Sequence, residues 1–406
     1  MTVNPQKQFF VILLIVFLGF LGISMPYLIF PALFLNPDYD ILDENATATA
    51  QALYLGVTLA VYPLGQFVGS PILGALSDDY GRKKLLTASL VVSAFFNLLT
   101  GFAISKHILW LLIASRFGAG LMEGNIAIAR AMATDIKAIS KQKTLGKINA
   151  AASIAYLIGP FFGGLLTDKN ISESFTTATP FYFTSLLLLA LTALAGVVLK
   201  GQTVTPSKMR SFWTRINLYN RLKNLFKNKT LQLLMILSTC FTIAVDIFYE
   251  FGPVFLTLKW DLSPADLIYY NGILCIGLAL GNGFLPKYFT NSPSNRQPII
   301  LSIFGFSLLL LLMIITEFPY LMLFFFGVSG LVIGLAVTLI TVKISDSASD
   351  QIQGEVLGVQ HSLRVLGDGI ICLFGGFLLL VSSKAILVAA AMIALLTMIY
   401  SYYRLA

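Results

Sequence analysis

Seven ionisable residues lie inside long apolar segments of this chain, where a lone charge costs about 3 kcal/mol or more. Arg116 and Glu123 are seven residues apart, which places them two turns apart on one face of a helix. A charge persists at such depth where it is paired, wetted or used, so each of the seven is a candidate for binding protons or a ligand. The seven residues are Arg116, Glu123, Asp246, Glu250, His361, Arg364 and Asp368.

Two further pairs are spaced four residues apart and therefore face the same side of a helix. Asp246 and Glu250 are both acidic, and two carboxylates this close repel each other, which suits a proton carrier. Arg364 and Asp368 have opposite signs and can neutralise each other, with a purely structural pair as the alternative. We therefore assign proton coupling to Glu123, Arg116, Asp246, Glu250 and Asp368.

Uncharged polar side chains in the same segments can line a cavity with hydrogen-bond donors and acceptors. For the aromatic ones the alternative is packing, or a place in the belt at the membrane surface. The predicted substrate contacts are Tyr62, Gln66, Asn125, Tyr156, Tyr249, Asn271, His361 and Arg364.

The composition indicates which elements must position these residues. The chain has 406 residues, of which 57% are hydrophobic and 11% charged, whereas a soluble protein carries about 25% charged residues. This excludes a soluble globule and a disordered chain, and three cysteines exclude a disulfide scaffold. No Walker, nucleophile-elbow or zinc motif occurs. We expect an integral membrane protein that is not an enzyme and needs no cofactor or metal.

Twelve segments have the length and apolar character of membrane-spanning helices, which need about 20 residues each. Their apolar runs are too continuous for the alternating strands of a membrane barrel. The segments are 9–35, 51–76, 85–105, 108–133, 145–167, 179–199, 231–258, 265–289, 298–316, 320–342, 355–381 and 384–403.

Lys and Arg residues predict the orientation of the chain, because they gather in cytoplasmic loops. With the N-terminus in the cytoplasm, 20 of the 27 basic residues lie on the inner side, four on the outer side and three within helices. We expect both termini in the cytoplasm, most simply at a bacterial inner membrane. The net charge of +8 then reflects topology and not a nucleic-acid partner.

Residues 200–230 divide the chain into halves at 1–199 and 231–406, each with six spans. This connection carries eight basic residues and no acid. Apolar residues recur in it every three to four positions, which favours an amphipathic helix on anionic lipid; a flexible basic linker is the alternative. The two halves also share glycine spacings: Gly120 and Gly124 reappear 210 residues later as Gly330 and Gly334. Two related helical bundles are therefore expected.

The loop after the second segment reads Gly74-Ala-Leu-Ser-Asp78-Asp79-Tyr-Gly81-Arg82-Lys83-Lys84. It resembles the GxLxDxxGRK motif of the major facilitator superfamily, which lies between the second and third of twelve spans. Residues 116–120 resemble the RxxxG motif of that family. The resemblance implies a loop that latches one conformation, through Gly74, Asp78, Gly81, Arg82 and Lys83.

The fifth segment resembles the GxxxGPxxGG motif of proton-coupled exporters, through Gly159, Pro160, Gly163 and Gly164. Similarity to the twelve-span drug/proton antiporters, including the tetracycline exporters, extends to residues 22–26 and 56–66. Those exporters tend to carry an acid in the first span, where the nearest position here is Gly19. In the second half, residues 281–296 keep neither the Asp nor the GRK of the loop motif.

The resemblance implies the major facilitator fold: an all-α membrane protein with twelve transmembrane helices in two six-helix bundles around a central cavity. The expected function is proton-coupled efflux of a small organic molecule by a monomer in lipid, with the proton gradient as the energy source. Alternatives are an exporter of an anionic metabolite or siderophore, a proton-coupled uptake symporter, and a receptor that binds without transport.

Overall fold

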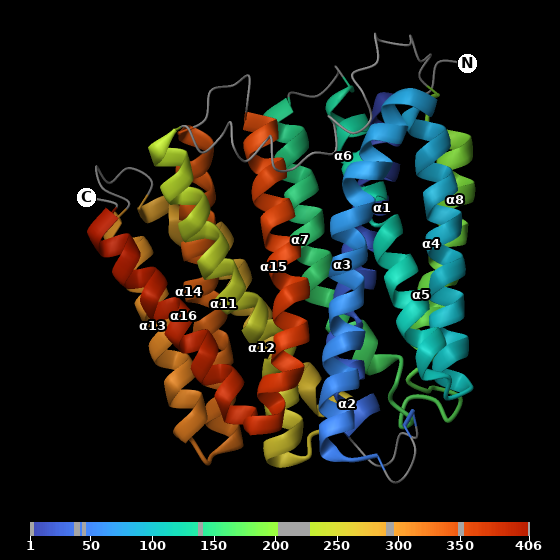
Figure 1. Cartoon of the computed structure of the whole chain (residues 1–406). Helices are drawn as coiled ribbons and strands as arrows, with labels where there is room; N and C mark the ends of the chain where they lie inside the picture. The colour runs from blue at the N-terminus through green and yellow to red at the C-terminus, as the bar shows by residue number, and fades with distance from the viewer. Residues whose placement is uncertain are drawn as a thin grey trace. The chain divides into compact units, whose positions relative to one another are not determined.

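The computed structural model describes residues 4–35, 41–42, 46–136, 141–201, 228–289, 296–347 and 353–404. All regular secondary structure in these ranges is helical (Figure 1), which confirms the predicted fold class. The earlier helices are α1 (Pro5–Ser24), α2 (Pro26–Leu35), α3 (Ala48–Tyr80), α4 (Arg82–Ser105), α5 (Leu109–Met122), α6 (Gly124–Thr134), α7 (Lys141–Leu165) and α8 (Thr179–Val198). The later ones are α11 (Lys229–Trp260), α12 (Pro264–Gly283), η1 (Leu285–Tyr288), α13 (Arg296–Ile315), α14 (Pro319–Asp346), α15 (Gln353–Val381) and α16 (Ser383–Arg404).

Each of the twelve predicted segments falls on one helix or on two successive helices. Nine helical segments in the described ranges are long and apolar enough to cross a membrane by themselves. The other three predicted spans correspond to α5 with α6, to α7 and to α12. Helix α5 and helix α6 are each short, and the apolar part of α7 is confined to Ile154–Leu165.

The first and fourth spans are interrupted, each for a local reason. Pro26 has no amide hydrogen for the helical ladder, and α1 ends two residues before it. Between α5 and α6 the chain tightens at Glu123: its amide donates to Gly120 O (3.0 Å), and the Ile126 amide donates to Glu123 O (3.1 Å). These i to i+3 bonds are of the 3₁₀ type, which within a helix often marks a functional position.

The chain divides into two compact units, residues 1–46 with 57–217 and residues 47–56 with 218–406. The sequence boundary would place 47–56 in the first half, but this first part of α3 belongs with the second unit. Residues 202–227 of the basic connection lie outside the described residues, so the amphipathic helix stays a prediction.

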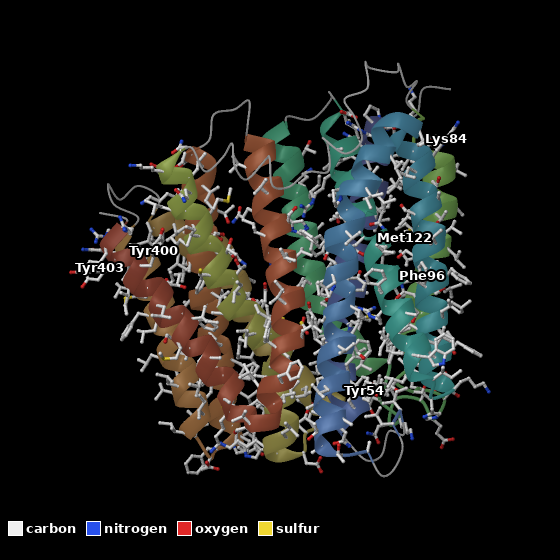
Figure 2. All side chains as sticks on the ribbon, viewed as in Figure 1. Tyr54, Lys84, Phe96, Met122, Tyr400 and Tyr403 are labelled. Carbon is white, nitrogen blue, oxygen red and sulfur yellow. The ribbon has the colours of Figure 1, made fainter. Side chains whose placement is uncertain are left out.

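The same pairs of helices pack together in both units, as an internal repeat requires. Contacts of α1 with α7, α4 with α8 and α4 with α5 correspond to contacts of α11 with α15, α13 with α16 and α13 with α14. Side chains fill the spaces between these helices (Figure 2). At one such contact the Phe96 ring of α4 occupies the space that a Cβ atom at Gly118 of α5 would need.

Glycines bring one further helix pair to backbone contact in each unit. A Cβ atom at Gly69 of α3 would overlap the carbonyl oxygen of Leu121 on α5. In the second unit a Cβ atom at Gly281 of α12 would overlap the carbonyl oxygen of Leu331 on α14 in the same way. Gly120 and Gly330, which the repeated spacing relates, lie at these same two helix contacts: a Cβ atom at Gly120 would overlap Tyr62 O of α3, and one at Gly330 would overlap Leu274 O of α12.

Candidate functional site

The first unit buries one acid, one base and one phenol in a single cluster. Tyr62, Arg116 and Glu123 are all less than 10% exposed. The Tyr62 hydroxyl donates to Glu123 Oε2 at 2.6 Å. The Arg116 guanidinium lies over the Tyr62 ring, with Cζ 4.2 Å from the ring centroid, a cation–π contact. The phenol therefore links the two charged groups.

Three elements position this cluster. Tyr62 lies in the middle of α3, Arg116 on α5, and Glu123 at the interruption between α5 and α6. Gly120 lets α5 approach closely, because a Cβ atom there would overlap the carbonyl oxygen of Tyr62. The predicted shared face of Arg116 and Glu123 is consistent with this placement, since both side chains line the same small cavity.

That cavity has a volume of about 10 Å³, which is the space of roughly one water molecule. Asn125 lines it, as do Ser93 and Asn97, which were not predicted. Asn97 Nδ2 donates to Ser93 O at 2.9 Å. Two polar side chains one turn apart in the apolar third segment were the signal that could have identified them. A proton or a water molecule fits here, whereas an organic molecule does not.

The second oxygen of Glu123 faces α1. Oε1 is enclosed and accepts no hydrogen bond within the described part of the chain. A Cβ atom at Gly19 would lie 3.3 Å from it and 2.9 Å from Ile126 Cδ1. The missing side chain at Gly19 thus leaves the space that the Glu123 carboxylate occupies.

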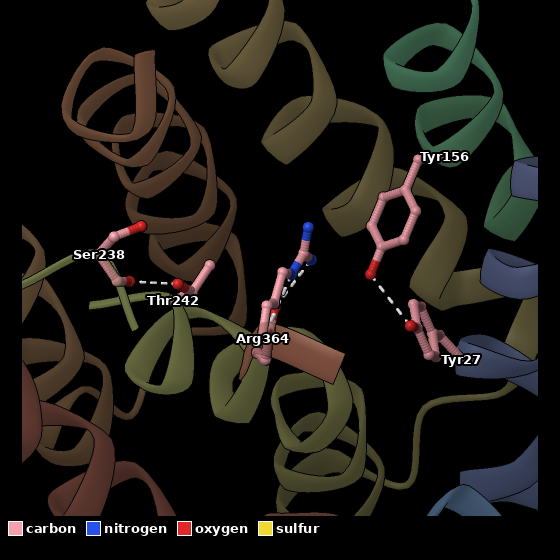
Figure 3. Close-up of polar contacts among 6 residues, drawn as sticks. Tyr27, Tyr156, Ser238, Thr242 and Arg364 are labelled. Atoms are coloured by element: carbon pink, nitrogen blue, oxygen red, sulfur yellow. Dashed lines mark hydrogen bonds and ion pairs between the residues drawn. The ribbon is translucent and has the colours of Figure 1, made fainter. Parts of the chain in front are cut away.

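The other two predicted contacts of this unit are Gln66 on α3 and Tyr156 on α7. Gln66 is buried on α3, one turn after Tyr62. On α7 the Tyr156 hydroxyl donates to the Tyr27 hydroxyl at 3.0 Å (Figure 3). Tyr27 was not predicted, and its position directly after Pro26 gives no periodic signal.

In the second unit, the charged residues come from α11 and α15. Arg364 Nη2 lies 3.0 Å from Asp246 Oδ1, and Arg364 Nε lies 3.3 Å from Asp246 Oδ2 (Figure 3). The sequence spacing pointed instead to Asp368, one turn along on the same helix. Asp246 is 3% exposed, and a buried carboxylate is stabilised by a two-pronged guanidinium contact. The packing of α11 against α15 supplies that contact.

Two acids, Glu250 of α11 and Asp368 of α15, also lie close together across these two helices. A carboxylate oxygen of Glu250, a carboxylate oxygen of Asp368 and Cys372 Sγ all lie within 4.8 Å of one another. Asp246 and Glu250 still follow each other on one face of α11, as predicted. The acids brought together from different helices are Glu250 and Asp368, which periodicity within one helix does not reveal.

A larger cavity of about 170 Å³ lies in the second unit among α11, α14 and α15. The predicted contacts His361 and Arg364 both line it. Gln360 Nε2 donates to Ser238 Oγ at 2.6 Å. The Thr242 hydroxyl donates to Ser238 O (Figure 3). A cavity of this volume is large enough for several water molecules or part of a small organic molecule. The predicted contacts Tyr249 and Asn271 are half-buried on α11 and α12.

The loop between α3 and α4 is held by contacts with the C-terminal ends of two other helices, α6 and α8. Gly81 has φ 95°, which favours glycine. Arg82 forms an ion pair with Asp135 at the end of α6, and Lys83 Nζ donates to Gly196 O at 2.7 Å. Gly74 has open space around it. The Asp78 side chain lies outside the described residues.

The glycines of the fifth span pack against the interrupted first span. A Cβ atom at Gly159 would lie 2.8 Å from Leu21 O, and one at Gly163 would lie 2.7 Å from Met25 O. Pro160 lies within α7, and Gly164 is buried. The contacts of Gly159 and Gly163 lie within the first unit.

Comparison with known proteins identifies the family. The family model described as Major Facilitator Superfamily matches residues 12–372. This chain belongs to the major facilitator superfamily. Members of this superfamily are transporters, so the chain is an integral, multi-pass membrane transporter.

Curated relatives of this major facilitator transporter include several tetracycline resistance proteins. The class H protein of Pasteurella multocida is 34% identical over 43% of this chain, and the class C protein of Escherichia coli is 31% identical over 46%. Those matches cover only 41% and 44% of the two relatives' lengths. The class E protein of Escherichia coli is 26% identical over a match that covers 87% of this chain and 84% of the relative's length.

Solved structures share the fold at low identity. A bacterial homologue of the human lysosomal transporter Spinster, in an inward-facing and unoccupied conformation, has a TM-score of 0.75 at 11% identity, covering 99% of this chain and 97% of its own. The human organic anion transporter MFSD10 has a TM-score of 0.71 at 15% identity, covering 98% and 99%.

Proposed function

We propose that this transporter exports a small organic molecule in exchange for protons, by alternating access. The observation that carries the proposal is the buried Tyr62–Arg116–Glu123 cluster in the first unit. Costly buried charges of this kind in a membrane protein mark a pathway for ions or protons.

Glu123 is the proposed proton carrier. One of its oxygens accepts the Tyr62 hydroxyl, and the other faces the space at Gly19. The adjoining cavity of about 10 Å³ admits one water molecule, and that water can deliver a proton. The same cavity is too small for the exported molecule. Protonation of Glu123 changes the net charge beside Arg116, and that change can bias which side of the membrane the transporter faces.

The substrate is proposed to contact the second unit. Its larger cavity combines a histidine, an arginine paired with an acid, and several hydroxyl and amide groups. Such a lining suits a small organic molecule with oxygen or nitrogen acceptors. Because the relatives include tetracycline resistance proteins, tetracycline is the first compound to test.

The remaining parts of the proposal concern conformation and setting. The two units would rock about a site reached alternately from each side, and the Arg82–Asp135 contact would help to hold the loop that latches one state. The proton gradient of a bacterial inner membrane would supply the energy, with both termini in the cytoplasm, a monomer as the working unit and no cofactor.

Everted membrane vesicles test this proposal directly. Respiration makes their interior acidic, and a pH-sensitive dye follows the gradient. Adding tetracycline or another panel compound should collapse the gradient in vesicles with the transporter and leave it intact in vesicles without it. A gradient that survives every compound tested, while purified protein binds one of them, would favour an uptake symporter or a receptor over an exporter.

A further inference from the structure

We infer that Arg130 of α6 holds the acidic group of a small organic anion, at a binding position of the first unit that is separate from the Tyr62–Arg116–Glu123 cluster. Binding follows from the geometry of this unit alone. Its use as a contact for the transported molecule rests on the proposed function, and it narrows the exported molecule to one that carries a carboxylate, a sulfonate or a similar group.

The first step is the charge of Arg130, which lies four residues before the last residue of α6. A guanidinium stays charged in proteins and carries five N–H donors. Among the described residues no acid forms an ion pair with Arg130, and its enclosed Nε has no hydrogen-bond acceptor. The acids nearest to it along α6 are engaged elsewhere, since Glu123 accepts the Tyr62 hydroxyl and Asp135 pairs with Arg82. A membrane helix does not keep such a charge without a use for it.

The second step is the depth of the guanidinium. Side chains on a helix lean toward its N-terminus, and α6 begins at Gly124. The Arg130 guanidinium lies over the Phe20 ring of α1, with Cζ 5.7 Å from the ring centroid. Phe20 is 11 residues after Phe9, where the apolar run of α1 begins, or about 16 Å along a membrane core of about 30 Å. Lipid phosphates lie at the surface of that core, so the anion that fits here is a molecule that enters the transporter.

The third step is access to the guanidinium. Arg130 is partly exposed, and neither of its Nη nitrogens is among the enclosed atoms. Ala127, one turn earlier on the same side of α6, is exposed. Phe20 covers one face of the guanidinium near the limit of about 6 Å for a cation–π contact, and a ring offers no acceptor to N–H donors. The edge of the guanidinium is therefore available, and a carboxylate can accept two parallel N–H bonds there.

A second cation beside α1 shows what an ordinary surface position looks like. Lys147 of α7 makes the same kind of contact with Phe9, with Nζ 5.8 Å from the ring centroid. Lys147 is exposed and lies where the apolar run of α1 begins, so water and lipid phosphate can satisfy its ammonium group. Arg130 has the aromatic contact at mid-depth without this surface, which leaves an entering anion as its partner.

Fluorescence polarisation of the purified transporter in detergent tests binding without a proton gradient. The probe is fluorescein, a small organic anion at mildly alkaline pH, and its counterpart is pyronin Y, a cation on the same three-ring frame. Wild type should bind fluorescein saturably. Arg130→Gln should weaken that binding about tenfold or more, because hydrogen bonds between charged groups are lost, and Arg130→Lys should weaken it less. The matched control is Lys147→Gln, which removes a cation from an exposed position and should bind fluorescein as wild type does.

Each outcome decides the matter, with elution volume and helix content verifying that the variants fold. Absence of saturable fluorescein binding to wild type would overturn the inference, as would equal binding by Arg130→Gln or a matching loss of pyronin Y binding in that variant. Displacement of fluorescein by phosphatidylglycerol, but not by the same amount of phosphatidylcholine, would instead assign Arg130 to lipid. Failure of Glu123→Gln to alter proton flux would remove the proposed carrier role of Glu123 and leave fluorescein binding unaffected.

Discussion

At the scale of residues, the sequence identified most of the charged groups but not their partners. Glu123 and Arg116 were found because ionisable residues are rare in apolar segments, and both side chains line one small cavity. Tyr62 reaches Glu123 from a different helix, and Arg364 reaches Asp246 from a different helix. Contacts between helices depend on how the helices pack, which spacing within one helix does not encode.

The space at Gly19 gives a prediction at this scale. Glu123→Ala should lower proton-coupled transport about 100-fold or more, since it removes the proposed proton-transfer group. The double change Glu123→Ala/Gly19→Asp returns a carboxylate to the same space from α1, with the flexible end of Ile126 moving aside. We expect partial recovery of substrate-driven proton movement in everted vesicles.

A matched control uses another glycine of α1. Gly22→Asp in the Glu123→Ala background places an acid on α1, one turn away from Gly19. Equal recovery from positions 19 and 22, or recovery from neither in a folded protein, would contradict the assignment of this space to a proton-carrying acid.

At the scale of elements, the position and order of the apolar segments could be predicted, because an apolar run of about twenty residues is stable in lipid as a helix. The interruption at Glu123 was not predicted, since no proline marks it and the neighbouring Gly118, Gly120 and Gly124 are also typical of close helix packing. The repeated glycines were visible in the sequence, but the carbonyl groups that they approach were not. Close helix contact needs a small residue on one helix and a facing backbone on the other. The sequence reveals the small residue but not which backbone faces it.

Two glycines of α12 give the prediction for this scale. Gly281→Ala should destabilise the transporter by about 1–3 kcal/mol, because its new methyl group would overlap the Leu331 carbonyl oxygen. Gly272→Ala on the same helix has open space around the new methyl group and should be neutral or slightly stabilising. Thermal unfolding in detergent, followed by the loss of monodisperse protein, compares the two variants. Equal midpoints would show that the α12–α14 contact is looser than described.

At the scale of the whole molecule, composition alone excluded every soluble class, and the family match agrees with that conclusion. The division into two compact units and the repeated helix contacts account for the 210-residue glycine spacing. The boundary within α3 was not predictable, because residues 47–56 continue the same helix without a break.

Orientation is the untested property at this scale. The ratio of 20 inner to four outer basic residues predicts that both chain ends lie in the cytoplasm. Green fluorescent protein fused after residue 406 should fluoresce, and alkaline phosphatase fused there should be inactive. The same phosphatase fused within the loop at Lys169 should be active, and the reverse pattern would refute the topology.

Proton flux through Glu123 tests the central claim most directly. Purified wild type and Glu123→Gln are each reconstituted into vesicles that contain a pH-sensitive dye. An inward gradient of a compound identified with the everted vesicles is then applied. Wild type should release protons from the vesicle interior as the substrate enters, and Glu123→Gln should abolish that release while binding of the compound persists. Glu173→Gln, a change at an exposed outer acid, serves as the control. Unchanged proton release in Glu123→Gln would contradict the account.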